Sequence, residues 1–255
     1  MKKQVTLKNT EYIRRTEDKT TFIDTRTNKP FDFSSLHNAK NRTYDGLSYK
    51  DYILYSICAH SESDKMSGIH SISGTPFNCY CDRKACNKDY ICSSCYSRTI
   101  LKRRIDLHFK CSKNEWFYSN IELTLKDIPF LNDKYFRFES FGELTSTLKV
   151  KNYFLICEKN TDTFFAFFTK MPHIISIAMN YYNIAKPCNC KILQSSYRKN
   201  NVDTIKRDFI DTTFTVYTDD FIKNNSIDIN CEKKCIHCLK CYTHNNIAEI
   251  SERLK

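Results

Sequence analysis

The stretch Thr163-Phe164-Phe165-Ala166-Phe167-Phe168-Thr169-Lys170 is a continuous apolar and aromatic run that ends in polar residues. Three similar runs lie on either side of it along the chain, at Tyr135–Phe138, Lys191–Leu193 and Phe214–Tyr217. A short apolar run without alternation is typical of a strand buried on both faces, as strands of a parallel sheet are. The four runs therefore predict neighbouring, mainly parallel strands.

Helix-length segments separate the first three runs, at Leu148–Glu158 and Ile174–Ile184. Strands that alternate with helices form βαβ units, which predict an α/β fold with a partial, barrel-like sheet. In such sheets ligands bind beyond the carboxyl ends of the strands. The expected site residues are the polar groups that follow the runs: Glu143, Lys170, Ser195 and Asp219. Polar residues also end strands for structural reasons, and spacing alone leaves that alternative open.

The chain divides by composition into three parts. Residues 1–50 are polar and indicate an irregular arm with short strands, or disorder. Residues 51–230 carry the predicted sheet and a first cysteine cluster, and residues 231–255 carry a second cluster. Within the middle part, the run Tyr52–Ala59 suits a buried strand, and the segment 96–110 predicts a basic helix with an apolar side.

Composition excludes some functions and indicates the cellular compartment in which the protein resides. The 255 residues include only four glycines, so neither a Walker loop nor a dinucleotide-binding glycine motif is present. The basic N-terminus is not followed by an apolar stretch, and the most apolar region, residues 163–185, is interrupted by Lys170, Pro172 and His173. We therefore expect a cytoplasmic protein without a membrane partner. In a reducing compartment, clusters among the 14 cysteines are metal ligands more often than disulfides.

The second cluster places four thiols within 11 residues with the spacing C-x3-C-x2-C-x2-C: Cys231, Cys235, Cys238 and Cys241. Structural zinc sites usually draw two short pairs from separate turns, whereas a compact run of thiolates is more typical of iron–sulfur ligation. The spacing favours an iron–sulfur cluster, with zinc as the alternative, in which His237 could replace one thiolate. We expect this centre to tie the end of the chain to the sheet.

The first cluster contains five cysteines, more than one tetrahedral site needs: Cys79, Cys81, Cys86, Cys92 and Cys95. The ligand subset is open, and the best three-ligand loop, C-x5-C-x2-C, consists of Cys86, Cys92 and Cys95. The pair Cys188 and Cys190 could complete either site. Three single cysteines beside apolar residues predict core packing instead: Cys58, Cys111 and Cys157.

Six short pieces occur in order along most of the chain: Leu36–Lys40, Cys95–Ser97, Phe136–Glu143, Phe165–Lys170, Ser195–Ser196 and Cys235–Tyr242. This order resembles the bacteriophage gene product 88 family, whose members have an Asn-Ala-Lys-like element, a Cys-Tyr-Ala, a strand that ends in Ser-Gly-Asp, and a C-terminal cysteine run. Here Phe141-Gly142-Glu143 replaces Ser-Gly-Asp, and Ser97 stands where Ala is usual. The resemblance implies an architecture and a phage origin, hence the cytoplasm of an infected host, but no settled activity.

A more distant similarity is to radical S-adenosylmethionine enzymes, in which a three-cysteine loop and a helix precede a strand that ends in Gly-Glu. Cys86, Cys92 and Cys95, the basic helix, and Gly142-Glu143 follow that order, although the usual spacing is C-x3-C-x2-C. The similarity implies an iron–sulfur cluster whose open iron binds S-adenosylmethionine, with Glu143 holding the ammonium group and Gly142 allowing close approach. From their places at the predicted strand ends, we also expect Ser195 to contact the cofactor, and Glu143 and Lys170 to be catalytic.

A different class of function also fits the composition. The formal net charge of +11, the run Lys102-Arg103-Arg104 and the pair Lys233-Lys234 suit a zinc-stapled module that binds nucleic acid or a host protein without catalysis. A basic helix is often only a solvated face, and many aromatic residues must fill the core. Metal content separates the two hypotheses, because iron with sulfide favours the enzyme and zinc favours the binding module.

Overall fold

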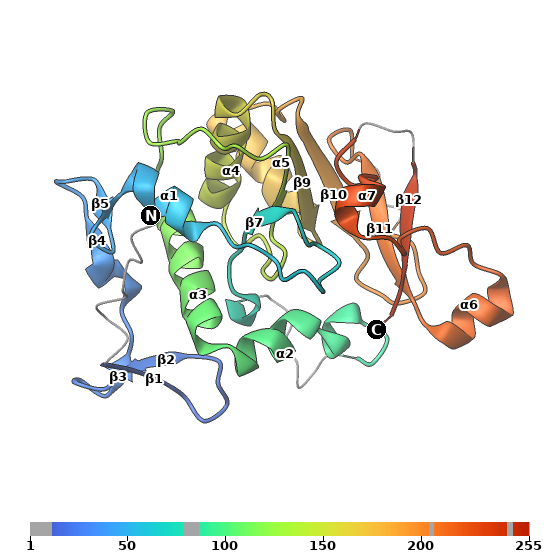
Figure 1. The fold of residues 1–255 in the computed structure, drawn as a ribbon, viewed down its shortest axis with the longest axis horizontal. Helices are drawn as coiled ribbons and strands as arrows, with labels where there is room; N and C mark the ends of the chain where they lie inside the picture. The colour runs from blue at the N-terminus through green and yellow to red at the C-terminus, as the bar shows by residue number, and fades with distance from the viewer. Residues whose placement is uncertain (1–11, 79–86, 204–206, 244–246, 255) are drawn as a thin grey trace.

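Six parallel strands form the central sheet of the computed structural model, which describes residues 12–78, 87–203, 207–243 and 247–254 (Figure 1). The strands lie side by side in chain order: β7 (His70–Ile72), β8 (Tyr135–Phe138), β9 (Phe164–Thr169), β10 (Cys190–Ser195), β11 (Thr212–Tyr217) and β12 (Glu249–Arg253). All neighbours pair in parallel, which confirms the α/β class and the prediction for the four runs. In the described ranges no pairing joins the edge strands β7 and β12, so the sheet is not a closed barrel.

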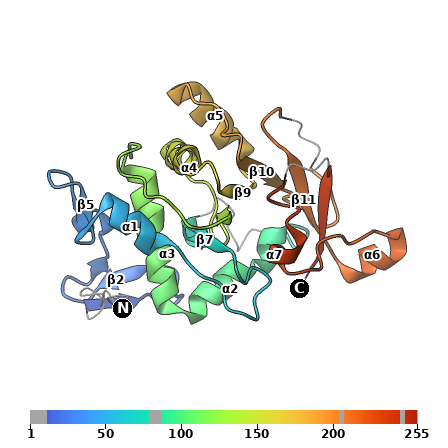
Figure 2. The same ribbon diagram turned by 45° about the horizontal axis from the view of Figure 1, so that its top comes forward.

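Helices cover one face of this sheet, which we call the helix face. They are α3 (Ile105–Asn120), α4 (Thr147–Lys159) and α5 (Pro172–Tyr182), and the last two match the predicted helical segments. Figure 2 shows α4 and α5 layered on the sheet. Phe165 and Phe167 of β9 face these helices, whereas Ala166 and Phe168 face the opposite side. This alternation follows from the two-residue period of a strand, and it leaves a second apolar face to be covered.

The prediction of a strand at Tyr52–Ala59 is wrong, because this run contributes to the helix α1 (Tyr49–Ser56). Ser48 caps the helix by accepting a hydrogen bond from the Asp51 amide at 3.1 Å. Tyr49, Tyr52, Ile53 and Ser56 are buried, at the spacing of one helix face. The helix predicted over residues 96–110 is confirmed in part: α2 (Tyr96–Arg103) forms its first half, the helix breaks at Arg104, and the rest belongs to α3.

The described part of the N-terminal arm consists of two small antiparallel sheets, as expected for an arm with short strands. The first contains β1 (Ile13–Arg15), β2 (Phe22–Asp24) and β3 (Lys29–Pro30), and the second contains β4 (His37–Asn38), β5 (Thr43–Tyr44) and β6 (Leu47–Ser48). The arm packs against α3, because the ring of Phe22 lies 5.0 Å from that of Phe109. The remaining helices are short: α6 (Asp219–Asn225), α7 (Cys235–Cys238) and the 3₁₀ turns η2 (Phe33–Leu36), η3 (Pro76–Asn78) and η4 (Ile91–Ser94). Within the described ranges, no helix combines the length and apolar character needed to cross a bilayer.

The imidazole of His108 in α3 is fully buried between two aromatic rings. Its centroid lies 4.5 Å from that of Phe22 and 4.6 Å from that of Phe77, and neither ring nitrogen has a hydrogen-bond partner among the described residues. Burial lowers the pKa of His108 from 6.5 to about 4. Between these two pH values the unfolded chain binds a proton that the folded chain does not, so stability falls as the pH falls through this window.

We expect the stability of His108→Phe to depend less on pH between about 4 and 6.5 than that of the wild type. In the wild type, the difference in pKa lowers the free energy of unfolding by up to about 3 kcal/mol between neutral pH and about pH 4. The variant lacks the titrating group and should not show this decrease. At neutral pH the variant should unfold at nearly the wild-type denaturant concentration, because it replaces two unsatisfied polar atoms by a ring of similar shape. Denaturant unfolding at about pH 4.5 and pH 7 measures both effects. The same loss of stability in variant and wild type would contradict the assignment.

Candidate functional site

The carboxylate of Glu143 lies beyond the carboxyl end of β8, where residues at the end of β9 hold it. Its Oε1 accepts hydrogen bonds from Thr169 Oγ1 at 2.6 Å and from the Leu144 amide at 2.9 Å. Its Oε2 accepts one from the Lys170 amide at 2.9 Å. The structure thus brings together the predicted residues Glu143 and Lys170. Glu143 is buried and accepts only this one hydrogen bond at Oε2 from the described residues, so a lone pair there can accept another donor.

The cysteine loop lies at the same edge of the sheet. The Ile91 amide of η4 donates to the Tyr197 carbonyl at 2.9 Å, which fixes the loop to the end of β10. The Tyr96 hydroxyl donates to the Ser140 carbonyl at 2.7 Å, which fixes the following turn to the end of β8. Cys92 and Cys95 are half-buried here. The loop is thus attached at the strand edge that carries Gly142–Glu143, and a direct meeting of these cysteines with Glu143 stays a prediction. The predicted ligand Cys86, with Cys79 and Cys81, lies outside the described residues.

Sequence reasoning missed Tyr197, whose backbone carbonyl holds the cysteine loop and whose phenol interacts electrostatically with Glu143 and Cys92. Burial is the largest cause that raises the pKa of Tyr197 to about 12; Glu143 and Cys92 act in the same direction, and Lys170 opposes them. The phenol is therefore neutral at physiological pH, and its hydroxyl donates to Met171 Sδ at 2.8 Å. The available signal was its position, directly after the predicted Ser195-Ser196 at the end of β10. We refer to Glu143, Lys170, Cys92, Cys95 and Tyr197 as the strand-end site.

A buried ionic cluster contacts the backbone of Glu143 and so supports the strand-end site. The Lys149 ammonium lies 2.7 Å from Glu115 Oε2 and 2.6 Å from Glu139 Oε1, and Tyr153 donates to the same Glu139 oxygen at 2.7 Å. Burial lowers the pKa of Lys149, but the two carboxylates outweigh it and raise the pKa overall. Lys149 also donates to the Glu143 carbonyl at 3.0 Å. The cluster therefore fixes the backbone of the residue whose carboxylate faces the site.

Gly142 has a packing role in this loop. A Cβ atom on Gly142 would lie 2.2 Å from Glu139 Oε2 and 2.8 Å from the Gly74 carbonyl carbon, so a side chain does not fit. Glu139 itself adopts a left-handed backbone with φ of 56°, which is strained for a residue other than glycine. Close approach at Gly142 is thus required by the neighbouring turn, and its predicted contact with a cofactor stays a prediction.

The other two predicted residues lie at strand ends but are not joined to Glu143 by a hydrogen bond among the described residues. Ser195 is the last residue of β10 and is buried. Asp219 begins α6 beyond β11, where it is exposed and forms an ion pair with Arg253 at 2.9 Å. The strand-end site is therefore centred on β8, β9 and β10 rather than on the whole edge of the sheet.

The C-terminal cysteines cover the second apolar face of the sheet. We call residues 231–242 the cysteine segment and the face below it the cysteine face. Cys231, Cys235 and Cys241 pack against the apolar cluster that includes Phe168 and Leu193. The Cys235 amide donates to the Lys65 carbonyl at 2.8 Å, which attaches the segment to the loop before β7. The prediction that the segment ties the chain end to the sheet is thus consistent with its packing, and its metal remains a prediction.

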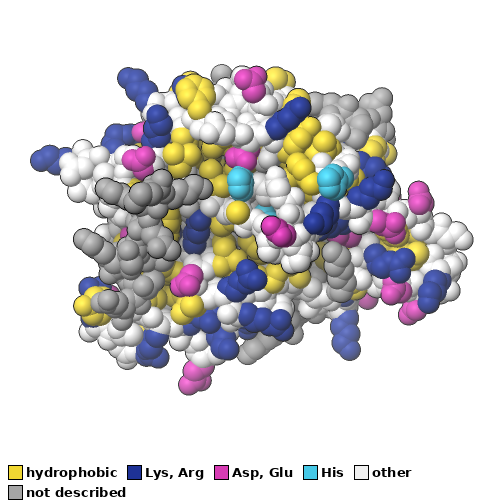
Figure 3. Space-filling view, viewed as in Figure 1, with side chains coloured by type: hydrophobic (Ala, Val, Ile, Leu, Met, Phe, Trp, Pro, Cys, Tyr) yellow, Lys and Arg dark blue, Asp and Glu magenta, His cyan; other side chains and the backbone are white. Residues whose placement is uncertain are grey.

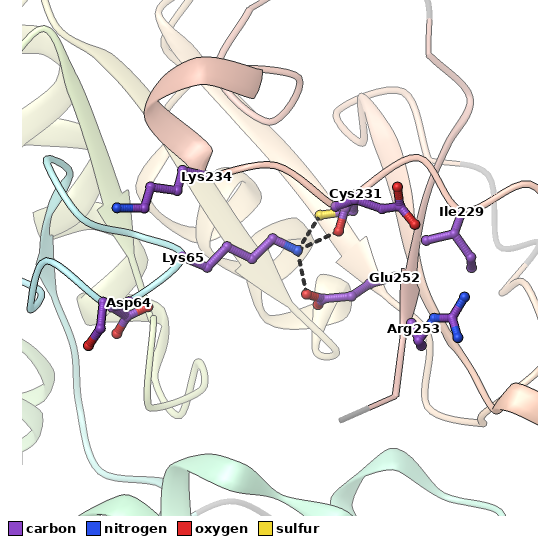
Figure 4. Close-up of a pocket in the computed structure, with 9 residues that line it drawn as sticks. Asp64, Lys65, Ile229, Cys231, Lys234, Glu252 and Arg253 are labelled. Carbon is purple, nitrogen blue, oxygen red and sulfur yellow. Dashed lines mark hydrogen bonds and ion pairs between the residues drawn. The ribbon is translucent and has the colours of Figure 1, made fainter.

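A pocket of about 330 Å³ opens beside the cysteine segment (Figure 4). In it the Lys65 ammonium contacts Cys231 Sγ at 3.1 Å, the Cys231 carbonyl at 2.6 Å and Glu252 Oε1 at 2.6 Å. The described residues contain no group of three or more His, Cys, Asp or Glu side chains placed to hold a metal ion. A metal would therefore have to draw the cysteine side chains together.

The remaining cysteines are mostly core residues. Cys58, Cys111 and Cys157 are buried, which confirms that prediction. Cys190 is buried on the helix face beside Cys157, so it does not complete either cysteine cluster. Its position on β10 explains this, because alternate residues of a strand point to opposite faces and Cys190 shares the helix face with Ile192.

Comparisons of the chain with protein-family models, with curated proteins and with solved structures find no match. The similarities described from the sequence therefore remain predictions, and the geometry of the strand-end site carries the functional argument.

Proposed function

We propose that the chain is an iron–sulfur protein of the radical S-adenosylmethionine type, with its cofactors at the strand-end site of a partial, barrel-like sheet. The observation that supports the proposal most strongly is that the loop with Cys92 and Cys95 is attached at the carboxyl edge of the parallel strands, where the Glu143 carboxylate also lies. Ligands bind at this edge in parallel α/β sheets. The thiols of Cys92 and Cys95 are half-buried rather than enclosed in the core like Cys111, which suits ligands of a cluster.

Each residue of the site has a role in this proposal. Cys86, Cys92 and Cys95 would hold the cluster, which when bound supplies an electron to S-adenosylmethionine. Three donors orient the Glu143 carboxylate, whose Oε2 can accept a hydrogen bond from the ammonium group of a methionine moiety. Lys170 orients Glu143 through its amide. The phenol of Tyr197 interacts electrostatically with both Glu143 and Cys92, and would remain neutral beside the bound group.

The basic surface gives less support to nucleic-acid binding. Figure 3 shows Lys and Arg side chains in the region of α2, but Asp and Glu side chains are interspersed with them on the same face. Such a mixed surface lacks the continuous basic stripe that follows a phosphate backbone. We therefore do not propose a zinc-stapled binding module, and the experiment below would reveal one as a protein that holds zinc and does not bind S-adenosylmethionine.

The test is a calorimetric titration of S-adenosylmethionine into anaerobically iron-reconstituted protein. We expect binding to wild type, and binding about tenfold or more weaker to Glu143→Gln, which keeps the shape but loses the charge. Glu122→Gln is the matched control, because Glu122 is an exposed glutamate paired with Lys151. The double variant Cys92→Ser/Cys95→Ser should lose the cluster and the binding. Absence of binding to reconstituted wild type, or zinc in a closed four-ligand site at the first cluster, would overturn the proposal.

A further inference from the structure

Arg137 on β8 points to the cysteine face and has no carboxylate partner among the described residues. Its neighbours Phe136 and Phe138 face the helices, so the alternation of the strand places Arg137 on the opposite side. Its guanidinium carbon lies 3.8 Å from the ring centroid of Phe168, and Nη1 makes a long contact of 3.4 Å to Met66 Sδ. The Nε–H is buried and has no hydrogen-bond partner in the described ranges.

A cation in this position is costly unless an anion compensates it. Arg137 interacts electrostatically most with Tyr96, next to the cysteine loop, and then with three residues of the cysteine segment: Tyr242, Cys241 and Cys235. Neutral thiols would leave the guanidinium uncompensated. Thiolates would compensate it, and four thiolates that share a zinc ion or an iron–sulfur cluster carry an excess of negative charge.

Two lysines also direct ammonium groups at the cysteine segment. Lys65 donates to Cys231 Sγ, and Lys191 donates to the carbonyls of Lys240 and Thr243 at 2.8 and 3.1 Å. Cations from β8, β10 and the loop before β7 therefore converge on one run of four cysteines. This convergence is the environment that lowers the cost of metal–thiolate charge in a protein interior.

We propose that the cysteine segment binds a metal through its four thiolates and that the half-buried Arg137 is the counter-cation of this second centre, with its buried Nε–H directed to a cysteine sulfur. Arg137 is a positioning residue that stabilises the charge of the centre. The centre is distinct from the strand-end site and does not depend on S-adenosylmethionine binding there. Zinc and an iron–sulfur cluster share the thiolate chemistry, and the experiment distinguishes them.

The experiment uses the full chain in a background in which all five cysteines of the first cluster (Cys79, Cys81, Cys86, Cys92 and Cys95) are replaced by serine, so that the first cluster cannot contribute to the metal that is counted. We expect this protein to retain zinc, or iron with sulfide, and Arg137→Gln to weaken retention against a chelator by about tenfold or more. If the metal is iron, the reduction potential of Arg137→Gln should also become more negative, because a positive charge near the cluster is lost. Arg253→Gln is the matched control, since Arg253 is an exposed arginine paired with Asp219, and it should match the parent.

Arg137→Lys keeps the charge but loses the planar fork of donors, and we expect metal retention between that of Arg137→Gln and the parent. This variant decides the matter if Arg137→Gln does not fold. A background protein without metal, or an Arg137→Lys and Arg137→Gln pair that both retain metal as firmly as the parent, would overturn the inference. Failure of S-adenosylmethionine binding with this metal intact would overturn only the proposed function.

Discussion

Lys149→Met is expected to destabilise the protein by about 3–5 kcal/mol, because it leaves two carboxylates buried without their shared cation. The side chain of Lys149 is fully buried, as is that of Glu139, and the side chain of Glu115 is 6% exposed. Since domains of this kind are stable by about 5–15 kcal/mol, the loss is a large part of the total. Denaturant unfolding at neutral pH measures it.

The matched control is Lys151→Met on the same helix. Lys151 forms an ion pair with Glu122, whose side chain is 63% exposed, and removing such a surface pair should cost less than about 1 kcal/mol. Adding Glu115→Gln and Glu139→Gln to Lys149→Met should recover part of the loss, because neutral amides are less costly to bury than unpaired charges. A Lys149→Met protein as stable as the Lys151→Met control would contradict the role of the cluster.

Cys238→Ser is expected to reduce the metal content by one centre and to lower the thermal midpoint. The cysteine segment has little regular structure besides the single turn of α7, yet it covers the apolar residues Phe168 and Leu193. The binding energy of a structural metal is folding energy, so losing one of four ligands loosens this cover. A loss of about 3 kcal/mol would lower the midpoint of a chain of this size by roughly 6–12 °C.

Cys188→Ser is the matched control for this variant. Cys188 is exposed and precedes β10, so its substitution should leave both the metal content and the midpoint unchanged. Parallel metal analysis and thermal unfolding compare the two variants. Equal metal content and equal midpoints for Cys238→Ser and wild type would show that the cysteine segment is not a metal centre.

The parts of the fold that could be predicted from the sequence are those that depend on the pattern of apolar residues within a short segment. β9 and β10 are buried along almost their whole length, and β8 and β11 partly, so the four runs stand out as apolar segments. The edge strands β7 and β12 were not predicted. The first has three residues, and the second, Glu249–Arg253, is mainly polar because an edge strand is partly exposed. The apolar run at Tyr52 was mistaken for a strand because periodicity over eight residues does not separate a short helix from a strand.

The candidate site was predictable to the extent that parallel topology determines it. Glu143 and Lys170 end adjacent strands, so their meeting follows from the order of the sheet. The contact of Lys149 with Glu115 was not predictable, because it joins two helices across 34 residues and depends on how they pack. The environment of Arg137 likewise requires the cysteine segment to return over β8, which no local pattern specifies.

Iron, sulfide and zinc analysis of protein purified without oxygen tests the central claim most directly. The account predicts iron and acid-labile sulfide in the wild-type protein, with the iron of the strand-end site lost in Cys92→Ser/Cys95→Ser and no iron lost in Cys188→Ser. Zinc without iron or sulfide in the wild-type protein, or an iron content that the double variant leaves unchanged, would contradict an iron–sulfur cluster at the strand-end site.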